Sequence, residues 1–181
     1  MESSFYSEAE LPGLGLASYG EDVLISRKAS VYSPSGIHLG SHVRIDDFCI
    51  LSGKITLGSH IHLAAFCALY GRYGIEMQDY TGLSPRTIIF SATDDFGGDY
   101  LISPMVPEAA TNVSGGKVIL EKYVQVGAGC ILMPNICLHE GAAVGSMSLV
   151  NKSLEAWTIY FGVPAKPLKA RKKGLLDKLD Q

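Results

Sequence analysis

The sequence predicts an all-β solenoid, a fold in which short strands wind into stacked coils around one continuous core. Three observations predict it: aliphatic residues recur at every sixth position, this recurrence appears in two separate runs, and small or turn-forming residues lie between the aliphatic positions. A period of six excludes an α-helix, whose faces recur every 3.6 residues, and is typical of short strands joined by tight corners. Three six-residue blocks close one triangular coil, and stacked coils bury an apolar column.

The first run of repeats begins at Leu39 and reads LGSHVR, IDDFCI, LSGKIT, LGSHIH, LAAFCA, LYGRYG and IEMQDY. The second begins at Leu120 and reads LEKYVQ, VGAGCI, LMPNIC, LHEGAA and VGSMSL. Each block opens with an aliphatic residue, here called the opener, and the fifth position is apolar in most blocks. We expect the opener and the fifth residue to point inward. We expect the chain to turn two positions after the opener, where glycine or another small residue tolerates the corner.

The two runs are out of phase, so a non-repetitive segment lies between them. Residues from about 93 to 116 read TDDFGGDYLISPMVPEAATNVSGG, and a loop of this length inside a compact domain is usually functional or disordered. We divide the chain into an N-terminal extension (1–22), a repeat β-helix (23–152) with this extended loop, and a C-terminal cap (153–181). Within the cap, LKARKKGLLDKLD is expected to form a short helix over the end of the apolar column.

Composition excludes several classes of function. The chain has 181 residues and a net charge of −3, so it has no basic field for a nucleic-acid partner. No apolar run reaches the roughly 18 residues needed for membrane insertion, and residues 1–10 lack the apolar core of a secretory signal. The four cysteines lack C-x-x-C spacing, so we expect free thiols in a reducing cytoplasm and no metal site.

After the last repeat, the stretch GVPAKPLKARKK resembles the G-x-P-A-K-x-[IVL] signature of sugar acetyltransferases with hexapeptide repeats. The resemblance to hexapeptide-repeat acyltransferases covers roughly residues 20–173. The stretches RIDDFCILSG, HLAAFCALYG and SATDDFGGDY are most similar to the dTDP-4-amino-4,6-dideoxyglucose acyltransferases of O-antigen synthesis. The resemblance implies left-handed coiling, acetyl-CoA as acyl donor, a homotrimer with active sites between subunits, and a loop that helps to close each site.

The candidate catalytic residues lie where many relatives carry a histidine in S-x-T-x-H. This chain has Ser91, Ala92, Thr93, Asp94 and Asp95 there, so two carboxylates replace the histidine. A carboxylate is a poor base for an alcohol but suits the ammonium form of an amino sugar, which must lose one proton before it attacks. We therefore predict an N-acetyltransferase for a nucleotide-linked amino-dideoxy sugar. Repulsion between the acids is expected to raise one pKa. A solvated turn is the plain alternative.

Further candidates lie on the coils. His62 is a second candidate base because imidazole titrates near neutrality, although a lone outward histidine is usually only surface. Coenzyme A is expected along the last coils, where small residues leave room for its pantetheine arm and two cations of the cap suit its phosphates. These residues are Gly127, Gly129, Gly145, Ser146, Lys166 and Arg171. The glycines equally suit corners, and the cations equally suit a solvated surface.

Three other functions stay open at this stage. The first is O-acetylation of a sugar hydroxyl, as in galactoside and maltose acetyltransferases. The second is a carbonic anhydrase-like β-helix with zinc held by three histidines: His60 and His62 project to one face, but no third histidine follows at the spacing of that family. The third is a non-catalytic scaffold, which the acidic loop and cationic tail argue against.

Overall fold

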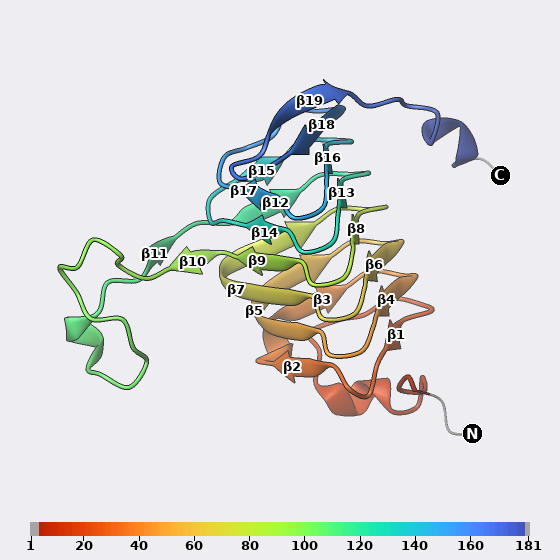
Figure 1. Cartoon of the computed structure of the whole chain (residues 1–181). Coiled ribbons are helices and arrows are strands. Elements are labelled where there is room, and N and C mark those ends of the chain that lie inside the picture. The colour runs from red at the N-terminus through yellow and green to blue at the C-terminus, as the bar shows by residue number, and fades with distance from the viewer. Residues whose placement is uncertain (1–3, 180–181) are drawn as a thin grey trace.

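The computed structural model describes residues 4–179; residues 1–3 and 180–181, which belong to the predicted terminal segments, lie outside the described residues. The chain folds as a left-handed parallel β-helix, as predicted (Figure 1). Two sheets run along the coils. The eight-stranded sheet contains β1 (Leu24–Ile25), β4 (Val43–Ile45), β6 (Ile61–Leu63), β8 (Gly82–Leu83), β13 (Gln125–Val126), β16 (Ala143–Val144), β18 (Thr158–Phe161) and β19 (Lys166–Ala170).

The nine-stranded sheet forms a second wall of the coils. Its strands are β2 (Ser30–Tyr32), β3 (Ile37–Leu39), β5 (Ile50–Leu57), β7 (Ala68–Met77), β9 (Ile88–Phe90), β12 (Val118–Leu120), β14 (Ile131–Leu132), β15 (Cys137–Leu138) and β17 (Leu149–Val150). The described helices are single 3₁₀ turns: η1 (Leu11–Leu14), η2 (Pro34–Gly36), η3 (Glu108–Ala110) and η4 (Leu176–Lys178). None of the described helices is long and apolar enough to cross a bilayer.

The openers form the core. All twelve openers are buried, and the fifth-position residues Cys49, Cys67 and Cys130 are fully buried beside them. Tyr73 is the exception among the expected inward residues, because it is 43% exposed. The cause is an insertion in its coil: Leu51 pairs with Leu69, 18 residues on, whereas Leu57 pairs with Met77, 20 residues on. The following coil is longer still, since Met77 pairs with Leu120. These insertions put the two runs out of phase.

The predicted position of the corners was wrong by one residue. The left-handed backbone lies three positions after the opener, and large residues such as Phe48 and Trp157 occupy it with φ of 61° and 51°. The small residue just after the opener is explained by close packing between successive coils, not by a corner. A Cβ on Gly40 would lie 2.6 Å from the backbone carbonyl carbon of Gly58 in the next coil. Corner side chains instead point outward and stack, with ring centroids 4.5 Å apart for His60 and Tyr80.

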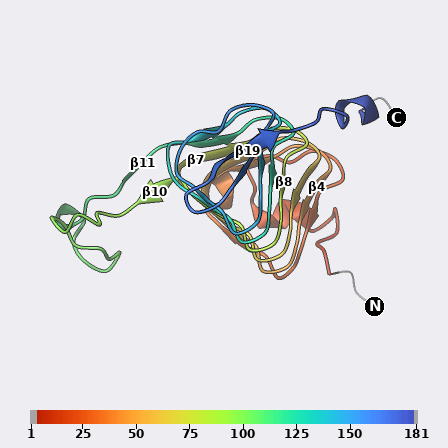
Figure 2. The same ribbon diagram turned by 45° about the horizontal axis from the view of Figure 1, so that its top comes forward.

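The inserted loop leaves the coils on a short antiparallel stem of β10 (Ala92–Thr93) and β11 (Ser114–Gly115). Residues 94–113 project well away from the column (Figure 2). At the base of the loop, the hydroxyl of Tyr73 donates to the carbonyl of Val113 at 3.0 Å. The extended loop predicted from the sequence is therefore present.

The predicted C-terminal helix is wrong for its first residues. Lys166–Ala170 form β19, antiparallel to β18, and the only helical turn in the described part of this segment is η4, at the side of the coils (Figure 1). The exposed edge of β18 provides backbone partners that a helix would leave unpaired. At the other end of the column, η1 places Leu11 in the core with 2% exposure.

Candidate active site

A groove of about 610 Å³ runs beside the eight-stranded sheet, between β4, β6, β8 and β13. We call it the histidine groove, because it is lined by His42, Arg44, His60, Ile61, His62, Ala64, Tyr80, Thr81, Gly82, Leu83, Ser84, Pro85 and Gln125. The structure thus brings the sequence candidate His62 into a concave surface. It also adds a third histidine, His42, because parallel pairing sets β4 directly beside β6.

His62 belongs to a small ionic network. Its Nε2 lies 2.8 Å from Oδ2 of Asp46, and Nε of Arg44 donates to the other oxygen of that carboxylate at 2.7 Å. Partial burial raises the pKa of Asp46, but the hydrogen bonds from Arg44 and His62 outweigh burial and leave this pKa below its usual value. An ionised carboxylate in this place orients the imidazole ring. A residue pair of this kind can hold and pass a proton.

Sequence reasoning missed two hydroxyls of the groove. Ser84 follows the inward Leu83, and Thr81 lies four residues after the buried Met77, at an inward position that is apolar in most coils. Thr81 is 2% exposed, and its Oγ1 has no hydrogen-bond partner among the described residues. An unpaired buried hydroxyl is costly, so it needs an explanation. In the sequence, Thr81 could have been identified only as a hydroxyl residue at an inward position where most coils carry an apolar side chain.

Asp94 lies elsewhere in the chain, at the base of the extended loop. It lines a pocket of about 350 Å³, the loop pocket, with Arg72, Ser103, Pro104, Val106, Glu108, Thr111 and Val113. The linings of the loop pocket and the histidine groove share no residue. Within one chain, the candidate bases Asp94 and His62 therefore face different sites.

Asp95 organises the loop. Its carboxylate accepts hydrogen bonds from the backbone N–H groups of Gly97 at 2.8 Å and of Asp99 and Tyr100 at 2.9 Å. The bond from Gly97, partly opposed by desolvation and reinforced by the other amides, lowers the pKa of Asp95. The raised pKa expected for one acid of the pair is therefore not found at Asp95, because the backbone amides outweigh desolvation.

The candidate coenzyme A residues have structural roles of their own. Gly129 takes a left-handed corner with φ of 70°, and a Cβ on Gly127 would lie 2.6 Å from the amide nitrogen of Ser146. A Cβ on Gly145 would meet the ring of Phe161 at 2.6 Å. These contacts account for the three glycines by packing alone, so their part in coenzyme A binding stays a prediction.

The two candidate cations differ in environment. Nη1 of Arg171 donates to the carbonyls of Tyr123 at 2.7 Å and Gly141 at 2.9 Å, and burial lowers the pKa of this guanidinium. Arg171 thus anchors the end of β19 to a coil corner. Lys166 is exposed at the start of β19. Arg171 lines a surface pocket with Tyr80, Tyr123 and Gln125, and Lys166 does not line that pocket.

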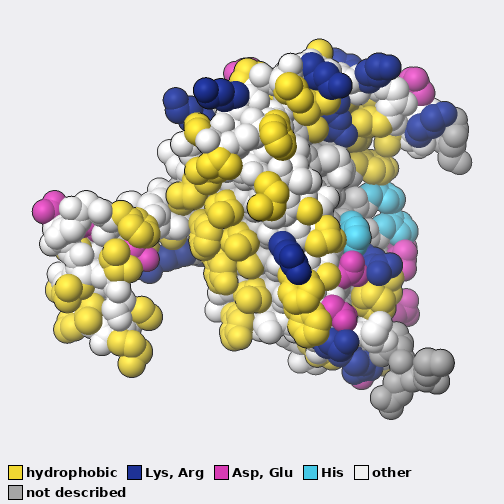
Figure 3. All heavy atoms as spheres, viewed as in Figure 1, with side chains coloured by type: hydrophobic (Ala, Val, Ile, Leu, Met, Phe, Trp, Pro, Cys, Tyr) yellow, Lys and Arg dark blue, Asp and Glu magenta, His cyan; other side chains and the backbone are white. Residues whose placement is uncertain are grey.

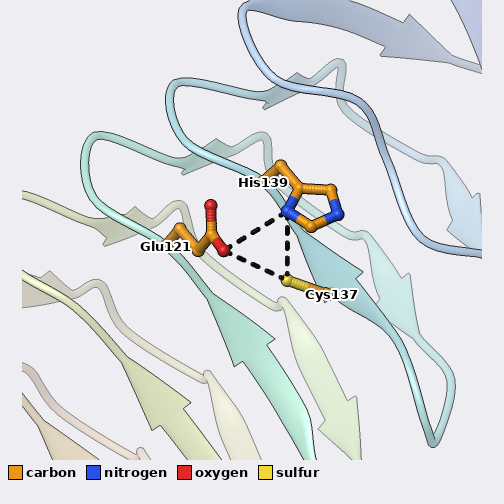
Figure 4. A group of neighbouring side chains, drawn as sticks. All are labelled: Glu121, Cys137 and His139. Carbon is orange, nitrogen blue, oxygen red and sulfur yellow. Dashed lines mark hydrogen bonds and ion pairs between the residues drawn. The ribbon is translucent and has the colours of Figure 1, made fainter.

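The three groove histidines do not form a metal-type cluster. The rings of His42 and His60 stack with centroids 4.7 Å apart, while His62 faces Asp46. Among residues 4–179, the donors that gather closely enough for a metal belong to a different group, Glu121, Cys137 and His139 (Figure 4). Burial, followed by the neighbouring Glu121, raises the pKa of the Cys137 thiol to about 11.

Comparison with known proteins decides the family. No protein-family profile matches the chain. A curated relative, dTDP-4-amino-4,6-dideoxy-D-glucose acyltransferase from Escherichia coli, is 40% identical over 177 residues, which is 96% of this chain and 92% of the relative. The chain belongs to the dTDP-4-amino-4,6-dideoxy-D-glucose acyltransferase family. It is an acyltransferase, as the sequence predicted.

Solved structures agree with this family. AntD, an N-acyltransferase from Bacillus cereus, is 51% identical with a TM-score of 0.96, over 98% of this chain and 97% of AntD. AntD structures hold dTDP, dTDP-4-amino-4,6-dideoxyglucose, coenzyme A or 3-hydroxybutyryl-CoA, and some carry the AntD substitutions D94N or S84A. A maltose O-acetyltransferase from Clostridium difficile shares only the fold, at 20% identity and a TM-score of 0.58 over 92% of this chain and 75% of its own.

Proposed function

We propose that this acyltransferase moves the acetyl group of acetyl-CoA to the 4-amino group of dTDP-4-amino-4,6-dideoxyglucose. The observation that carries the proposal is the match along nearly the whole chain to AntD, whose structures hold that sugar nucleotide together with coenzyme A. The family implies an acyl-CoA donor, and the acetyl group is the finer part of the proposal. The product would serve the synthesis of a surface polysaccharide, such as lipopolysaccharide.

The reaction needs three events at the acceptor. The bound ammonium gives one proton to a base, and the free amine attacks the thioester carbonyl. The tetrahedral intermediate then collapses, the C–S bond breaks, and the leaving thiolate of coenzyme A takes up a proton. The products are an amide and free coenzyme A. A base of ordinary strength suffices, because the acceptor is an amine rather than an alcohol.

Asp94 is our proposed base. It occupies the loop pocket beside Arg72, and its carboxylate, unlike that of Asp95, accepts no hydrogen bond from the loop backbone among the described residues. AntD was crystallised with its D94N and D94A substitutions, and this chain carries aspartate at its own position 94. Ser84 in the histidine groove similarly matches the number of the AntD substitutions S84A, S84C and S84T. Both residues are therefore proposed to contact the sugar nucleotide.

A homotrimer resolves the separation of the two sites within one chain. The loop carries Phe96 and Met105 with exposures of 83% and 90%, and Figure 3 shows hydrophobic side chains on the loop and along one face of the coils. Large exposed apolar surface of this kind marks an interface. In the proposed trimer, the loop of one subunit lies against the coils of the next, so that Asp94 of one chain and Ser84 of another line one active site.

Coenzyme A is proposed to lie along the last coils. Gly127, Gly129, Gly145 and Ser146 would flank its pantetheine arm. The exposed Lys166, and the guanidinium nitrogens of Arg171 other than Nη1, would approach its phosphates. A cytoplasmic location belongs to the same proposal and is supported by four free cysteines.

The deciding experiment measures thiol release by the purified protein from acetyl-CoA in the presence of dTDP-4-amino-4,6-dideoxyglucose. Mass spectrometry of the product should show one added acetyl group. The matched control acceptor is dTDP-6-deoxyglucose, which carries a hydroxyl in place of the amine. A parallel reaction with 3-hydroxybutyryl-CoA tests the choice of acyl group. We expect turnover with the amine acceptor and none with the hydroxyl acceptor. We also expect faster turnover with acetyl-CoA than with 3-hydroxybutyryl-CoA.

Two outcomes would overturn parts of the proposal. Equal or faster turnover of the hydroxyl acceptor would favour O-acetylation. A clear preference for 3-hydroxybutyryl-CoA would keep the acceptor and replace the acetyl donor. In either case, light scattering of the same sample tests the trimer, and a monomeric mass would contradict the shared active site.

A further inference from the structure

Glu121, Cys137 and His139 form a group that the transfer reaction does not use, here called the Glu–Cys–His cluster. Glu121 directly follows β12, while Cys137 and His139 flank the inward Leu138 of β15. Alternate residues of a strand share a face, so the thiol and the imidazole both point outward. Leu120 pairs with Leu138 in parallel register, which sets Glu121 beside His139. Figure 4 shows the three side chains facing one another.

The spacing of the donor atoms is that of a metal-binding triad. Sγ of Cys137 lies 3.6 Å from Nδ1 of His139 and 3.7 Å from Oε1 of Glu121, and Nδ1 and Oε1 are 3.3 Å apart. A tetrahedral zinc ion with usual bond lengths of about 2.3 Å to sulfur and about 2.0–2.1 Å to nitrogen and oxygen sets such edges at about 3.5, 3.5 and 3.3 Å. The same triangle accommodates hydrogen bonds from Nδ1–H and from the thiol to Oε1, so metal binding is the property that the experiment below must test.

Outer contacts hold the three ligands in place. The backbone N–H of Glu140 donates to Oε2 of Glu121 at 2.8 Å, which leaves Oε1 turned toward the thiol. Nε1 of Trp157 in turn donates to the carboxylate of Glu140 at 3.1 Å. The backbone N–H of Cys137 donates a hydrogen bond to Oγ of Ser153 at 2.9 Å. Such contacts around the ligands fix ligand orientation and support metal affinity.

Charge and exposure also fit a zinc ion. A carboxylate, a thiolate and a neutral imidazole together balance a charge of +2, and this mixed set of donors suits a borderline-soft ion. The side chains of His139 and Glu121 are 44% and 31% exposed, so an ion can enter from solvent and keep a water as fourth ligand. None of the three residues lines the histidine groove or the loop pocket.

We propose that Glu121, Cys137 and His139 form a zinc-binding site that ties β12 to β15 on the outer surface of the coils. The site lies outside the histidine groove and the loop pocket. Binding releases the thiol proton to solvent and forms bonds from the ion to Sγ, Nδ1 and Oε1. Because the unfolded chain does not hold these donors together, the ion stabilises the folded coils by mass action.

The test uses the full chain, freed of metal by chelation, with zinc chloride alone as the calorimetric titrant. One ion per chain is expected. Cobalt chloride gives a second readout, because bonding of a thiolate to Co²⁺ produces a charge-transfer absorption that carboxylate and imidazole sites lack. Cys137→Ser should abolish that absorption, and Cys137→Ser, His139→Asn and Glu121→Gln should each weaken zinc binding by at least about tenfold.

Cys130→Ser and His38→Gln are the matched controls, since they remove a thiol and a histidine elsewhere on the coils. Both should bind zinc within about twofold of the unaltered chain, well inside the effect of losing a ligand. His139→Asn alters an exposed side chain, so it tests the site even if Cys137→Ser fails to fold. The proposal is wrong if the unaltered chain binds no zinc, or if folded His139→Asn and Glu121→Gln bind it as tightly as the controls do.

Discussion

The coils and the extended loop satisfy their backbone groups in different ways. In the coils, each strand is hydrogen-bonded to the coil before and the coil after it, and openers such as Leu63 are completely buried. In the loop, one carboxylate, that of Asp95, collects the N–H groups of Gly97, Asp99 and Tyr100. Hydrogen bonds are spread over every coil, whereas in the loop three of them converge on the single carboxylate of Asp95. Substitutions should therefore affect the two regions very differently.

The largest expected effect is on the stability of the coils. Leu63→Ala removes a side chain with 0% exposure and leaves a cavity in the column, so the free energy of unfolding should fall by about 2–5 kcal/mol. Met105→Ser in the loop, where the side chain is 90% exposed, should change that free energy by less than about 0.5 kcal/mol. Urea unfolding measures both. Similar losses in the two variants would refute the contrast between the regions.

The next largest effect concerns the catalytic base, which lies either in the loop or on the coils. With Asp94 as base, Asp94→Asn should lower turnover of the amino sugar by about 10²-fold, the usual contribution of a general base. His62→Gln, which breaks the 2.8 Å contact with Asp46, should lower it by less than about tenfold. Steady-state kinetics at saturating acetyl-CoA separates the two. The reverse ranking would place proton transfer on the coils.

A smaller effect is expected from the acid that orders the loop. Asp95→Asn removes a charged acceptor of three backbone N–H groups, so residues 96–105 should become more sensitive to protease. The melting temperature of the coils should be unchanged. Asp99→Asn is the control, because it removes an exposed acid from the same loop. Equal protease sensitivity of the two variants would show that Asp95 does not order the loop.

The loop should also respond to acid. The pKa of Asp95 is lowered in the folded chain, so its stabilising effect is complete above the unfolded value of about 3.9 and is lost as the pH falls through the lower folded value. Hydrogen exchange of residues 96–105 should therefore speed up, relative to the intrinsic rate, only below about pH 4. The Asp95→Asn variant should lack this step. A step near neutral pH in the unaltered chain would point to another group.

The six-residue period was enough to predict the column but not the corners. Openers are placed by burial, which acts on every coil, so Leu39 and Val144 could be identified from the sequence. The left-handed corner residue could not, because large residues such as Tyr80 and Trp157 hold it by stacking on the neighbouring coils. Such neighbours are a whole coil apart in sequence. Tyr73 was misplaced for a related reason, since its coil holds two extra residues that only pairing reveals.

The candidate site was predicted only in part. Motif resemblance led to Asp94, and the outward position of His62 led to the groove, yet neither could say that the two lie in separate pockets of one chain. Thr81 was not identified, because two extra residues earlier in its coil move it out of the six-residue phase and its unpaired hydroxyl is visible only in the structure. Asp94 and Asp95 were predicted together to orient or deprotonate the ammonium, and this stays a prediction; the backbone bonds of Asp95 could be known only from the course of the loop.

The short antiparallel strand β19 has a consequence for how molecules meet in a concentrated solution. A stack of parallel coils ends in an edge that could accept the first coil of another molecule and so extend into a fibre. Lys166–Ala170 cover that edge in the opposite direction, and every residue of the covering strand is exposed. Pro167 lacks a backbone N–H donor, and Lys166 and Lys169 present positive charge to the matching positive charge of an approaching copy. The chain thus protects itself against end-to-end polymerisation.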